Sequence, residues 1–408
     1  MYNIIEGGVT AAKGFEAASH AAGIKYKDRT DMAMVYSKEP CECAGTFTTN
    51  VVKAACVLWD KDIVMSGSPM HAVVINSGIA NACTGNEGFD ACIRTAEAVE
   101  EALGIPYSTV AVASTGVIGM QLPVDKLVGG VGAMSEKLSD TKEAGTDASK
   151  AIMTTDTVNK EIAVTFSVGG QTVTLGGMSK GSGMIHPNMC TMLGFLTTDL
   201  CISKELLQKA LSEVVQDTFN MITVDGDTST NDTLLIMANG LAGNKKIETE
   251  NADYESFKEA LYAVCENLSR RMAADGEGAS KLFTAEVINA KNKTAARILA
   301  RSVVSSNLSK AAIYGCDANF GRFLCAMGYS GAVFDQEDVE LYFVSEYGKL
   351  KVFDKGTLPA FDEELATKIM SADEVTVLID MNEGKASATA WGCDLTEKYV
   401  KINADYRS

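Results

Sequence analysis

The most informative segment of this chain reads Lys180-Gly-Ser-Gly-Met-Ile-His-Pro-Asn-Met-Cys-Thr-Met-Leu-Gly-Phe-Leu-Thr-Thr-Asp199. It contains a glycine-flanked lysine ahead of a threonine, Thr191, that is embedded in apolar residues. A threonine hydroxyl is a weak nucleophile unless a base lies beside it, and cutting the chain just before the threonine supplies a free α-amine as that base. Such an amine has a reference pKa of about 7.7 to 8, so it can accept the hydroxyl proton near neutral pH without a histidine. The segment predicts a nucleophile at Thr191 and a cut at the Cys190–Thr191 bond.

Short apolar runs alternate with amphipathic stretches around this segment, which favours an α/β architecture. Residues 71–78 and 109–116 predict buried strands that each open into a glycine turn. Residues 162–166 and 172–175 flank a Gly-Gly turn and predict a hairpin that brings the Lys180 loop to an edge. Thr191 should begin a strand that leads into a helix. The other expected elements are that helix, capped by Ser203, a helix over 257–272 that ends near Gly276, and strands over 341–345 and 375–380.

Seven ordered blocks of the sequence resemble the ornithine acetyltransferase family. They are Ser114-Thr-Gly-Val-Ile-Gly119, Ala151-Ile-Met-Thr-Thr-Asp-Thr157, the segment from Lys180 to Asp199, Ile222-Thr-Val-Asp-Gly-Asp-Thr-Ser-Thr-Asn-Asp232, Asp275-Gly-Glu-Gly278, Asp317-Ala-Asn-Phe-Gly-Arg322, and Trp391-Gly-Cys-Asp-Leu-Thr396 with Ile402-Asn-Ala404. The resemblance implies a layered αββα-type sandwich, as in certain self-processing aminopeptidases, with a smaller C-terminal α/β part. It also implies self-cleavage into chains 1–190 and 191–408, which interleave in one fold and assemble as two copies of each.

The resemblance further implies an activity. Family members of arginine biosynthesis move an acetyl group from N-acetylornithine to glutamate through an acetyl-threonine ester, a ping-pong scheme. They differ in whether acetyl-CoA also serves as a donor, so both alternatives stay open for this chain. No cofactor is expected.

Site roles are carried over residue by residue from the same resemblance. The Thr115 hydroxyl and the Gly116 N–H are expected to stabilise the oxyanion, although a plain strand-to-loop turn is the simpler interpretation of this pair alone. Lys180 could bind a carboxylate or act on the Thr191 amine, and without the family it would be taken for a solvated loop lysine. Glu277 could pair with the ornithine ammonium or merely cap a helix. The remaining expected substrate contacts are Thr154 or Thr155, Asn403 and Ser408.

Composition limits the partners of the chain. Its 408 residues carry a formal net charge of -17, which argues against nucleic acid or an anionic membrane as the main partner. No run approaches the roughly 20 apolar residues of a membrane helix, and we expect a cytoplasmic protein. The eleven cysteines follow no repeated spacing, which is typical of reduced thiols, and three histidines without ligand spacing predict no metal site.

Three other stretches resemble known functional motifs but depart from them. The stretch 176–182 has the wrong glycine-to-lysine spacing for a phosphate loop. The acidic run 225–232 lacks the final glutamate of a calcium loop and is better explained as a tight turn that supports the site. Pro187 makes a Cys190–His186 nucleophile improbable. Two other functions stay open: an aminopeptidase or amidohydrolase of the same fold, which passes its acyl group to water, and a noncatalytic amino-acid-binding protein.

Overall fold

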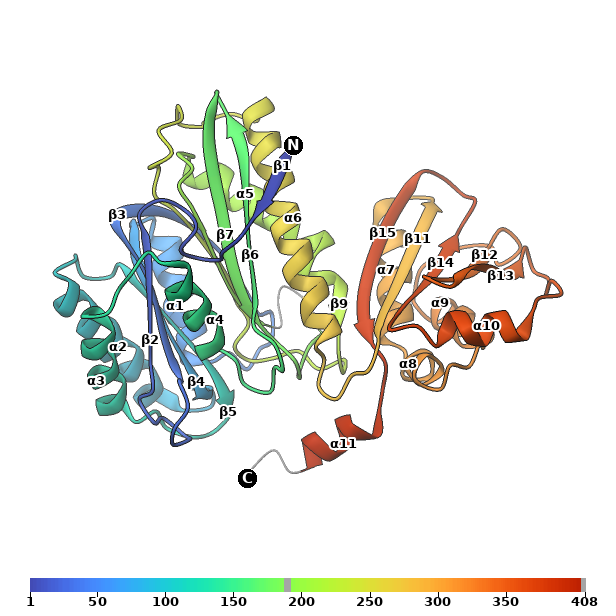
Figure 1. Cartoon of the computed structure of the whole chain (residues 1–408), viewed down its shortest axis with the longest axis horizontal. Coiled ribbons are helices and arrows are strands. Elements are labelled where there is room, and N and C mark those ends of the chain that lie inside the picture. Colours follow the sequence, from blue (N-terminus) through green and yellow to red (C-terminus); the bar gives the residue numbers. More distant parts are fainter. Residues whose placement is uncertain (187–191, 405–408) are drawn as a thin grey trace. The chain divides into compact units, whose positions relative to one another are not determined.

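The computed structural model describes residues 1–186 and 192–404. These residues divide into two compact units, each with its own sheet. The first unit comprises Met1–Gly181, 192–216 and Thr228–Leu268, and the second comprises Ser182–His186, Asp217–Asp227 and 269–404. Both units are mixed α/β structures (Figure 1), which confirms the predicted fold class.

The first unit is built on nine strands in the order β1-β6-β7-β8-β10-β3-β4-β5, with β2 beside β3. These strands are β1 (Tyr2–Ile5), β2 (Phe15–His20), β3 (Met32–Phe47), β4 (Met70–Ile79), β5 (Val110–Val117), β6 (Lys160–Val168), β7 (Gln171–Lys180), β8 (Leu193–Thr198) and β10 (Thr233–Ala238). Its helices are α1 (Ala55–Ser66), α2 (Gly85–Leu103), α3 (Val124–Ser135), α4 (Lys142–Ala151), α5 (Lys204–Val214) and most of α6 (Ala252–Ala274).

The long strand β3 turns this sheet into two stacked layers. Its first half pairs with β2 and β4, its second half pairs with β10, and the register breaks between Tyr36 and Cys41. Residues of both layers, such as Val35 of β3 and Phe195 of β8, share one buried cluster. Burial of apolar side chains between two sheet faces is what holds a sandwich together.

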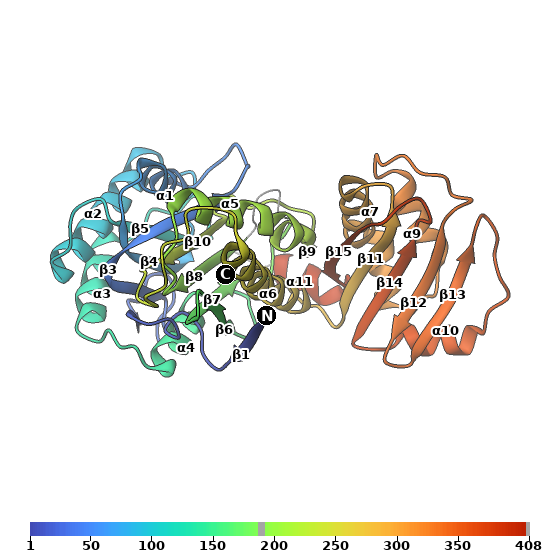
Figure 2. The same ribbon diagram turned by 90° about the horizontal axis from the view of Figure 1, so that it is seen from above.

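Helices cover the outer faces of the two layers. A second buried cluster joins α1, α2 and α3 to the β4–β5 layer. On the opposite layer, Val264 and Leu268 of α6 reach Gly177 of β7, and Gln208 of α5 hydrogen-bonds both backbone groups of Gly45. Figure 2 shows these helices from above. The expected αββα layering is therefore confirmed.

Two details of the strand predictions were wrong. Strands β4 and β5 lie where they were expected, but Gly78 and Gly116 are inside the strands and pair with each other instead of forming turns beyond them. The hairpin β6–β7 is confirmed, yet β7 is an interior strand that pairs with both β6 and β8. Lys180 is the last residue of β7 and pairs with Leu193, so it does not belong to an edge loop.

The helix predictions around the central segment were confirmed. The Ser203 hydroxyl caps α5 by accepting a hydrogen bond from the Leu206 amide at 3.4 Å, and α6 ends at Ala274, directly before the glycine-bracketed Glu277. Strand β8 begins at Leu193, and the expectation for Thr191 itself lies outside the described residues.

The second unit has a six-stranded sheet in the order β13-β12-β14-β11-β15-β9. The strands are β9 (Ile222–Thr223), β11 (Leu282–Ala290), β12 (Glu340–Ser345), β13 (Gly348–Asp354), β14 (Glu374–Asp380) and β15 (Ala386–Cys393). Its helices are α7 (Lys293–Ser305), α8 (Asn307–Tyr314), α9 (Phe320–Gly328), α10 (Glu363–Met370) and α11 (Glu397–Ala404), with a short 3-10 turn at Phe219–Met221. Another 3-10 turn, Val215–Asp217, lies where the chain passes from the first unit to the second.

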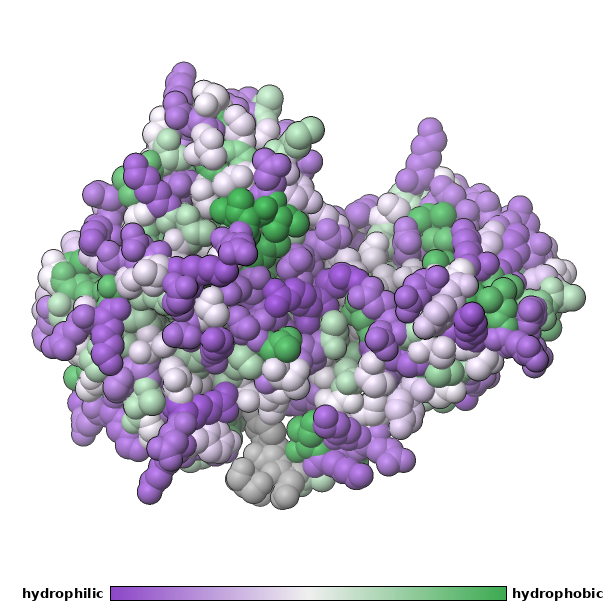
Figure 3. All heavy atoms as spheres, viewed as in Figure 1, coloured by the Kyte–Doolittle hydropathy of each residue, from purple (hydrophilic) through white to green (hydrophobic). Residues whose placement is uncertain are grey.

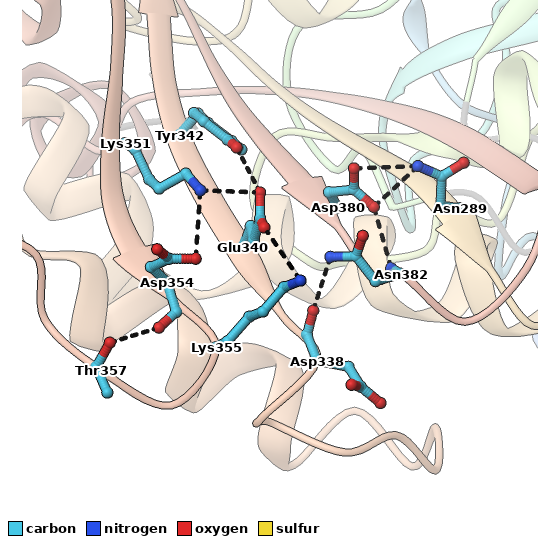
Figure 4. Close-up of polar contacts among 10 residues, drawn as sticks. All are labelled: Asn289, Asp338, Glu340, Tyr342, Lys351, Asp354, Lys355, Thr357, Asp380 and Asn382. Carbon is cyan, nitrogen blue, oxygen red and sulfur yellow. Dashed lines mark hydrogen bonds and ion pairs between the residues drawn. The ribbon is translucent and has the colours of Figure 1, made fainter.

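A polar network secures one end of this second sheet (Figure 4). Glu340 and Asp380 stand opposite each other on β12 and β14, and two like charges in that relationship destabilise a sheet unless each is compensated. Lys351 lies 3.1 Å from the Glu340 carboxylate, and the Asn289 amide donates to both oxygens of Asp380 at 2.9 and 3.0 Å. The network therefore compensates the two like charges that the pairing of β12 with β14 brings together.

Apolar residues appear only in small separate groups on the face drawn in Figure 3. Among the residues that the structure describes, no helix combines the length and the apolar character that crossing a membrane requires.

Candidate active site

Two predicted site residues meet inside the first unit. The ammonium group of Lys180, at the end of β7, donates to the hydroxyl oxygen of Thr115 on β5 at 3.3 Å. These strands belong to different layers of the sandwich, so the stacking of the layers brings them together. Lys180 is only 7% exposed, which excludes the solvated loop lysine that the sequence alone would favour.

Gly116 adopts a backbone conformation that suits glycine alone. Its φ is +133°, and a Cβ atom there would lie 2.2 Å from the carbonyl carbon of Gly78. The register of β4 against β5 shifts at this point. A bulge of this kind redirects backbone groups away from regular pairing. Gly116 therefore lies in a bulge between paired strands, and not in the plain strand-to-loop turn that was the simpler interpretation.

The acidic run 225–232 supports the same strand ends. Asn231 donates from its side-chain nitrogen to the carbonyl oxygens of Ala80 at 2.5 Å and Ser114 at 2.8 Å. Ser114 in turn donates through its hydroxyl to Asn76 at 2.7 Å. These buried hydrogen bonds fix the backbone next to Thr115, as expected for a turn that supports the site.

Asp156 links the 154–157 turn to the end of β7. It accepts hydrogen bonds from the amides of Gly181 at 2.8 Å and Thr154 at 3.1 Å, and it forms a fully buried ion pair with Lys160 at 2.8 Å. Burial opposes ionisation of this carboxyl, but the charges of Lys180 and Lys160 and these hydrogen bonds prevail and lower its pKa to about 2. Asp156 is therefore an anion at neutral pH.

Asp232 is the second buried acid of this cluster. Burial raises its pKa well above the usual value, although hydrogen bonds from Ser229 and Thr48 and the charge of Lys180 oppose the shift. Within the described part of the chain, its Oδ2 atom has no hydrogen-bond partner. Burial thus disfavours the charged form of Asp232, whereas the neighbouring Lys180 and Lys160 favour the charged form of Asp156. The described cluster brings both lysines and both acids together beside Thr115.

The sequence prediction missed Asp156, Lys160 and Asp232. Asp156 and Asp232 stand in the quoted blocks, beside Thr155 and Asn231, so adjacency to polar residues of the motifs was the signal that could have identified them. Their roles depend on burial, which a motif does not encode.

In the second unit, Glu277 and Asn403 meet. The Asn403 side-chain amide donates to the Glu277 carboxylate at 2.7 Å, and the Glu277 amide donates to the carbonyl oxygen of Ser182 at 2.8 Å. Glu277 is only 6% exposed. Gly183 leaves it room, because a Cβ there would lie 2.3 Å from the Glu277 carboxyl carbon. Asn403 lies in α11, the last described helix.

Asp225 and His186 organise the segment 182–186. Asp225 accepts hydrogen bonds from the amides of Met184 at 2.6 Å and Ile185 at 2.9 Å. His186 lies with its Nδ1 atom 3.1 Å from the Thr223 hydroxyl. Burial, helped by the charge of Arg301, lowers the His186 pKa to about 4, so this imidazole is neutral at physiological pH.

The roles expected for the site residues stay predictions. Cys190, Thr191 and Ser408 lie outside the described residues, and the choice between Thr154 and Thr155 as a substrate contact stays a prediction. Across residues 1–186 and 192–404, no group of three or more His, Cys, Asp or Glu side chains is arranged to hold a metal ion.

Comparisons with known proteins agree with the sequence motifs. The model of the ArgJ family matches residues 16–408. Arginine biosynthesis bifunctional protein ArgJ 1 of Clostridium acetobutylicum is 50% identical over 400 residues, which cover 98% of this chain and 97% of the relative. A crystal structure of arginine biosynthesis bifunctional protein argJ from Bacillus halodurans is 44% identical with a TM-score of 0.49, over 52% of this chain and 97% of that chain. Ornithine acetyltransferase complexed with ornithine from Mycobacterium tuberculosis is 42% identical with a TM-score of 0.43, over 47% and 100%.

The family model and the Clostridium acetobutylicum relative define the class of protein. It is an enzyme, an acyltransferase of arginine biosynthesis that acts on small molecules. The chain belongs to the ArgJ family. The noncatalytic amino-acid-binding alternative is thereby excluded.

Proposed function

We propose that this enzyme transfers an acetyl group from N-acetylornithine to glutamate through an ester on Thr191. The Thr191 hydroxyl attacks the acetyl carbonyl, its proton passes through the Thr191 α-amine to the leaving nitrogen, and the C–N bond breaks to release ornithine. The glutamate α-amine then attacks the ester and regenerates the hydroxyl. The proposal keeps two alternatives for the acetyl donor. Either N-acetylornithine alone acetylates Thr191, or acetyl-CoA does so as well.

The observation that carries the proposal is the contact of Lys180 with Thr115 in a buried cluster that also contains Asp156 and Asp232. Both half-reactions pass through an oxyanion, and a preorganised donor that faces it lowers the barrier by about 3 to 4 kcal/mol. The Thr115 hydroxyl and the Gly116 N–H are the proposed donors. Lys180 orients Thr115 and binds a substrate carboxylate.

The resemblance to the family supports a role for Glu277 in the same reaction. Its amide donates a hydrogen bond to the carbonyl oxygen of Ser182, which fixes the Glu277 loop. A carboxylate there can pair with the side-chain ammonium of ornithine, and Asn403 orients it at 2.7 Å. Thr154 or Thr155 and Ser408 are the other proposed substrate contacts.

Self-cleavage before Thr191 would generate the α-amine and two fragments, 1–190 and 191–408. Strand β7 precedes the proposed cut and β8 follows it, yet they pair over six residues. Strands β3 and β10 pair in the same way across the cut. Separating the fragments would open one sheet and expose its core, so we propose that they remain associated, as two copies of each.

Intact mass spectrometry under denaturing conditions tests the mechanism. Wild-type protein should appear as two fragments divided at Cys190–Thr191, and N-acetylornithine should add one acetyl group to the fragment that begins with Thr191. Thr191→Ala should remain uncut and unlabelled. Transfer by that variant would refute the assigned nucleophile.

The acceptor needs a separate measurement, because the hydrolase alternative uses the same nucleophile. Ornithine release from N-acetylornithine should depend on added glutamate, with N-acetylglutamate formed in equal amount. Equal release without glutamate, with acetate as product, would favour the hydrolase.

A further inference from the structure

A lysine and a cysteine lie in close contact in the second unit, and neither is among the residues assigned to transfer. The ammonium nitrogen of Lys281 lies 2.9 Å from the sulfur of Cys316 and 2.6 Å from the carbonyl oxygen of Met370. Reactive cysteines are typically partly exposed and stand beside a cationic side chain. Cys316 is partly exposed and meets both conditions.

The backbone of Cys316 is held in a rare conformation. Its φ is +52°, in the left-handed region that a residue with a Cβ atom seldom adopts. The position follows α8, and the Cys316 amide donates to the carbonyl oxygen of Ile313 at 3.3 Å. Backbone strain of this kind persists where the surrounding structure fixes it, and it is a recognised sign of functional positions. In this conformation the Cys316 sulfur lies 2.9 Å from the Lys281 nitrogen.

Lys281 is fixed as firmly as its partner. Asp394 accepts hydrogen bonds from the Lys281 amide at 3.1 Å and from the Ser280 amide at 2.8 Å, directly before β11 begins. Neither residue therefore needs a backbone rearrangement to keep its nitrogen and sulfur together.

We propose that Lys281 and Cys316 form a covalent nitrogen–sulfur cross-link when the enzyme meets hydrogen peroxide. The thiol sulfur first attacks the peroxide: an S–O bond forms, the O–O bond breaks, and the products are a sulfenic acid and water. The Lys281 nitrogen then attacks this sulfur: an N–S bond forms and the S–O bond breaks. Hydroxide leaves with one ammonium proton as water, and a second proton goes to solvent. Sulfur is oxidised, peroxide is reduced, and the protein loses two hydrogens relative to the neutral amine and thiol.

The cross-link is reversible by chemistry of the same class. A thiol reductant attacks the sulfenamide sulfur, which frees the Lys281 amine and restores Cys316 after a second thiol exchange. While it exists, the bond ties the start of β11 to the turn after α8, and so fixes one end of the loop that contains Glu277.

Peptide mass spectrometry of the intact enzyme tests this proposal. After brief exposure to hydrogen peroxide, a linked pair of peptides containing Lys281 and Cys316 should appear, lighter by two hydrogens than the sum of the free peptides, and dithiothreitol should remove it. Cys316→Ser and Lys281→Arg should both lack the linked pair. Cys325, an exposed thiol on α9, is the internal control that should oxidise without forming a link to a lysine.

The wild-type protein alone distinguishes the possible outcomes, so folding defects in the variants do not matter. Oxidation of Cys316 to sulfinic acid with no linked peptide would overturn the proposal. A linked pair that retains an extra oxygen would overturn the direct nitrogen–sulfur bond.

Discussion

The ammonium group of Lys180 donates to the hydroxyl of Thr115 at 3.3 Å, although β7 and β5 belong to different layers of the sandwich. The contact orients the hydroxyl that we propose as an oxyanion donor. Removing the donor by Thr115→Val should lower kcat about 100-fold, the usual effect of losing one such group. Thr115→Ser keeps the hydroxyl and is the matched control.

Lys180→Met should lower kcat/KM on the same scale, because a charge-assisted hydrogen bond contributes about 1.5 to 3 kcal/mol. Lys150→Met removes an exposed lysine of α4 and should leave the kinetics unchanged. Steady-state rates at several N-acetylornithine concentrations distinguish these outcomes. A Thr115→Val enzyme with wild-type kcat would remove Thr115 from the mechanism.

Gly116 offers a prediction about backbone geometry. Gly116→Ala should destabilise the protein by about 3 kcal/mol or more and abolish transfer, because a Cβ would overlap the Gly78 backbone at a positive φ. Gly119 also has a positive φ, of +83°, but a Cβ there meets nothing within 4 Å. Gly119→Ala should therefore cost only about 1 kcal/mol. Similar urea midpoints for the two variants would contradict the assigned crowding.

Much of this site could be predicted from the sequence, and the reasons for the rest are physical. The short apolar runs located β4 and β5 correctly, and the motif threonine and lysine of the two blocks do meet. The position of β7 within the sheet could not be derived, because a hairpin pattern predicts only the pairing of β7 with β6. The second pairing, with β8, depends on the tertiary fold. Hence Lys180 was expected at an edge and is found in the interior.

The ionisation states of the buried aspartates could not be predicted from the motifs either. Asp156 and Asp232 are both buried aspartates near Lys180, yet their pKa values shift in opposite directions. The charges of Lys180 and Lys160 outweigh burial at Asp156, whereas burial prevails at Asp232. The distinction requires the distances that the fold creates.

The ion pair of Asp156 with Lys160 leads to a stability prediction. Asp156→Asn should destabilise the enzyme by about 3 kcal/mol at neutral pH, because it leaves a buried ammonium without its counter-ion. Asp147→Asn breaks the exposed pair with Lys150 on α4 and should change stability by less than about 0.5 kcal/mol. Equal losses for the two variants, measured by urea unfolding, would show that the buried pair has no special role.

Lowering the pH should remove the stabilisation that the Asp156–Lys160 ion pair provides. The folded-state pKa of Asp156 is about 2, below the ordinary value of about 3.9, so its stabilisation is complete above pH 4 and is lost as the pH falls towards 2. The free energy of unfolding of the wild type minus that of Asp156→Asn should shrink across this window. A difference that stays constant would mean that Asp156 is not the titrating group.

Asp232 should respond to pH with the opposite sign. Because its folded-state pKa is raised, it contributes stability that is complete below the ordinary pKa of about 3.9 and is lost as the pH rises towards the folded-state value. Asp232→Asn supplies a neutral side chain of the same shape, so it should cost no more than about 1 kcal/mol at neutral pH. Relative to this variant, the wild type should become less stable as the pH rises above about 4, as urea unfolding at a series of pH values would measure. A wild type that gains stability over Asp232→Asn with rising pH would contradict the raised pKa of the Asp232 carboxyl.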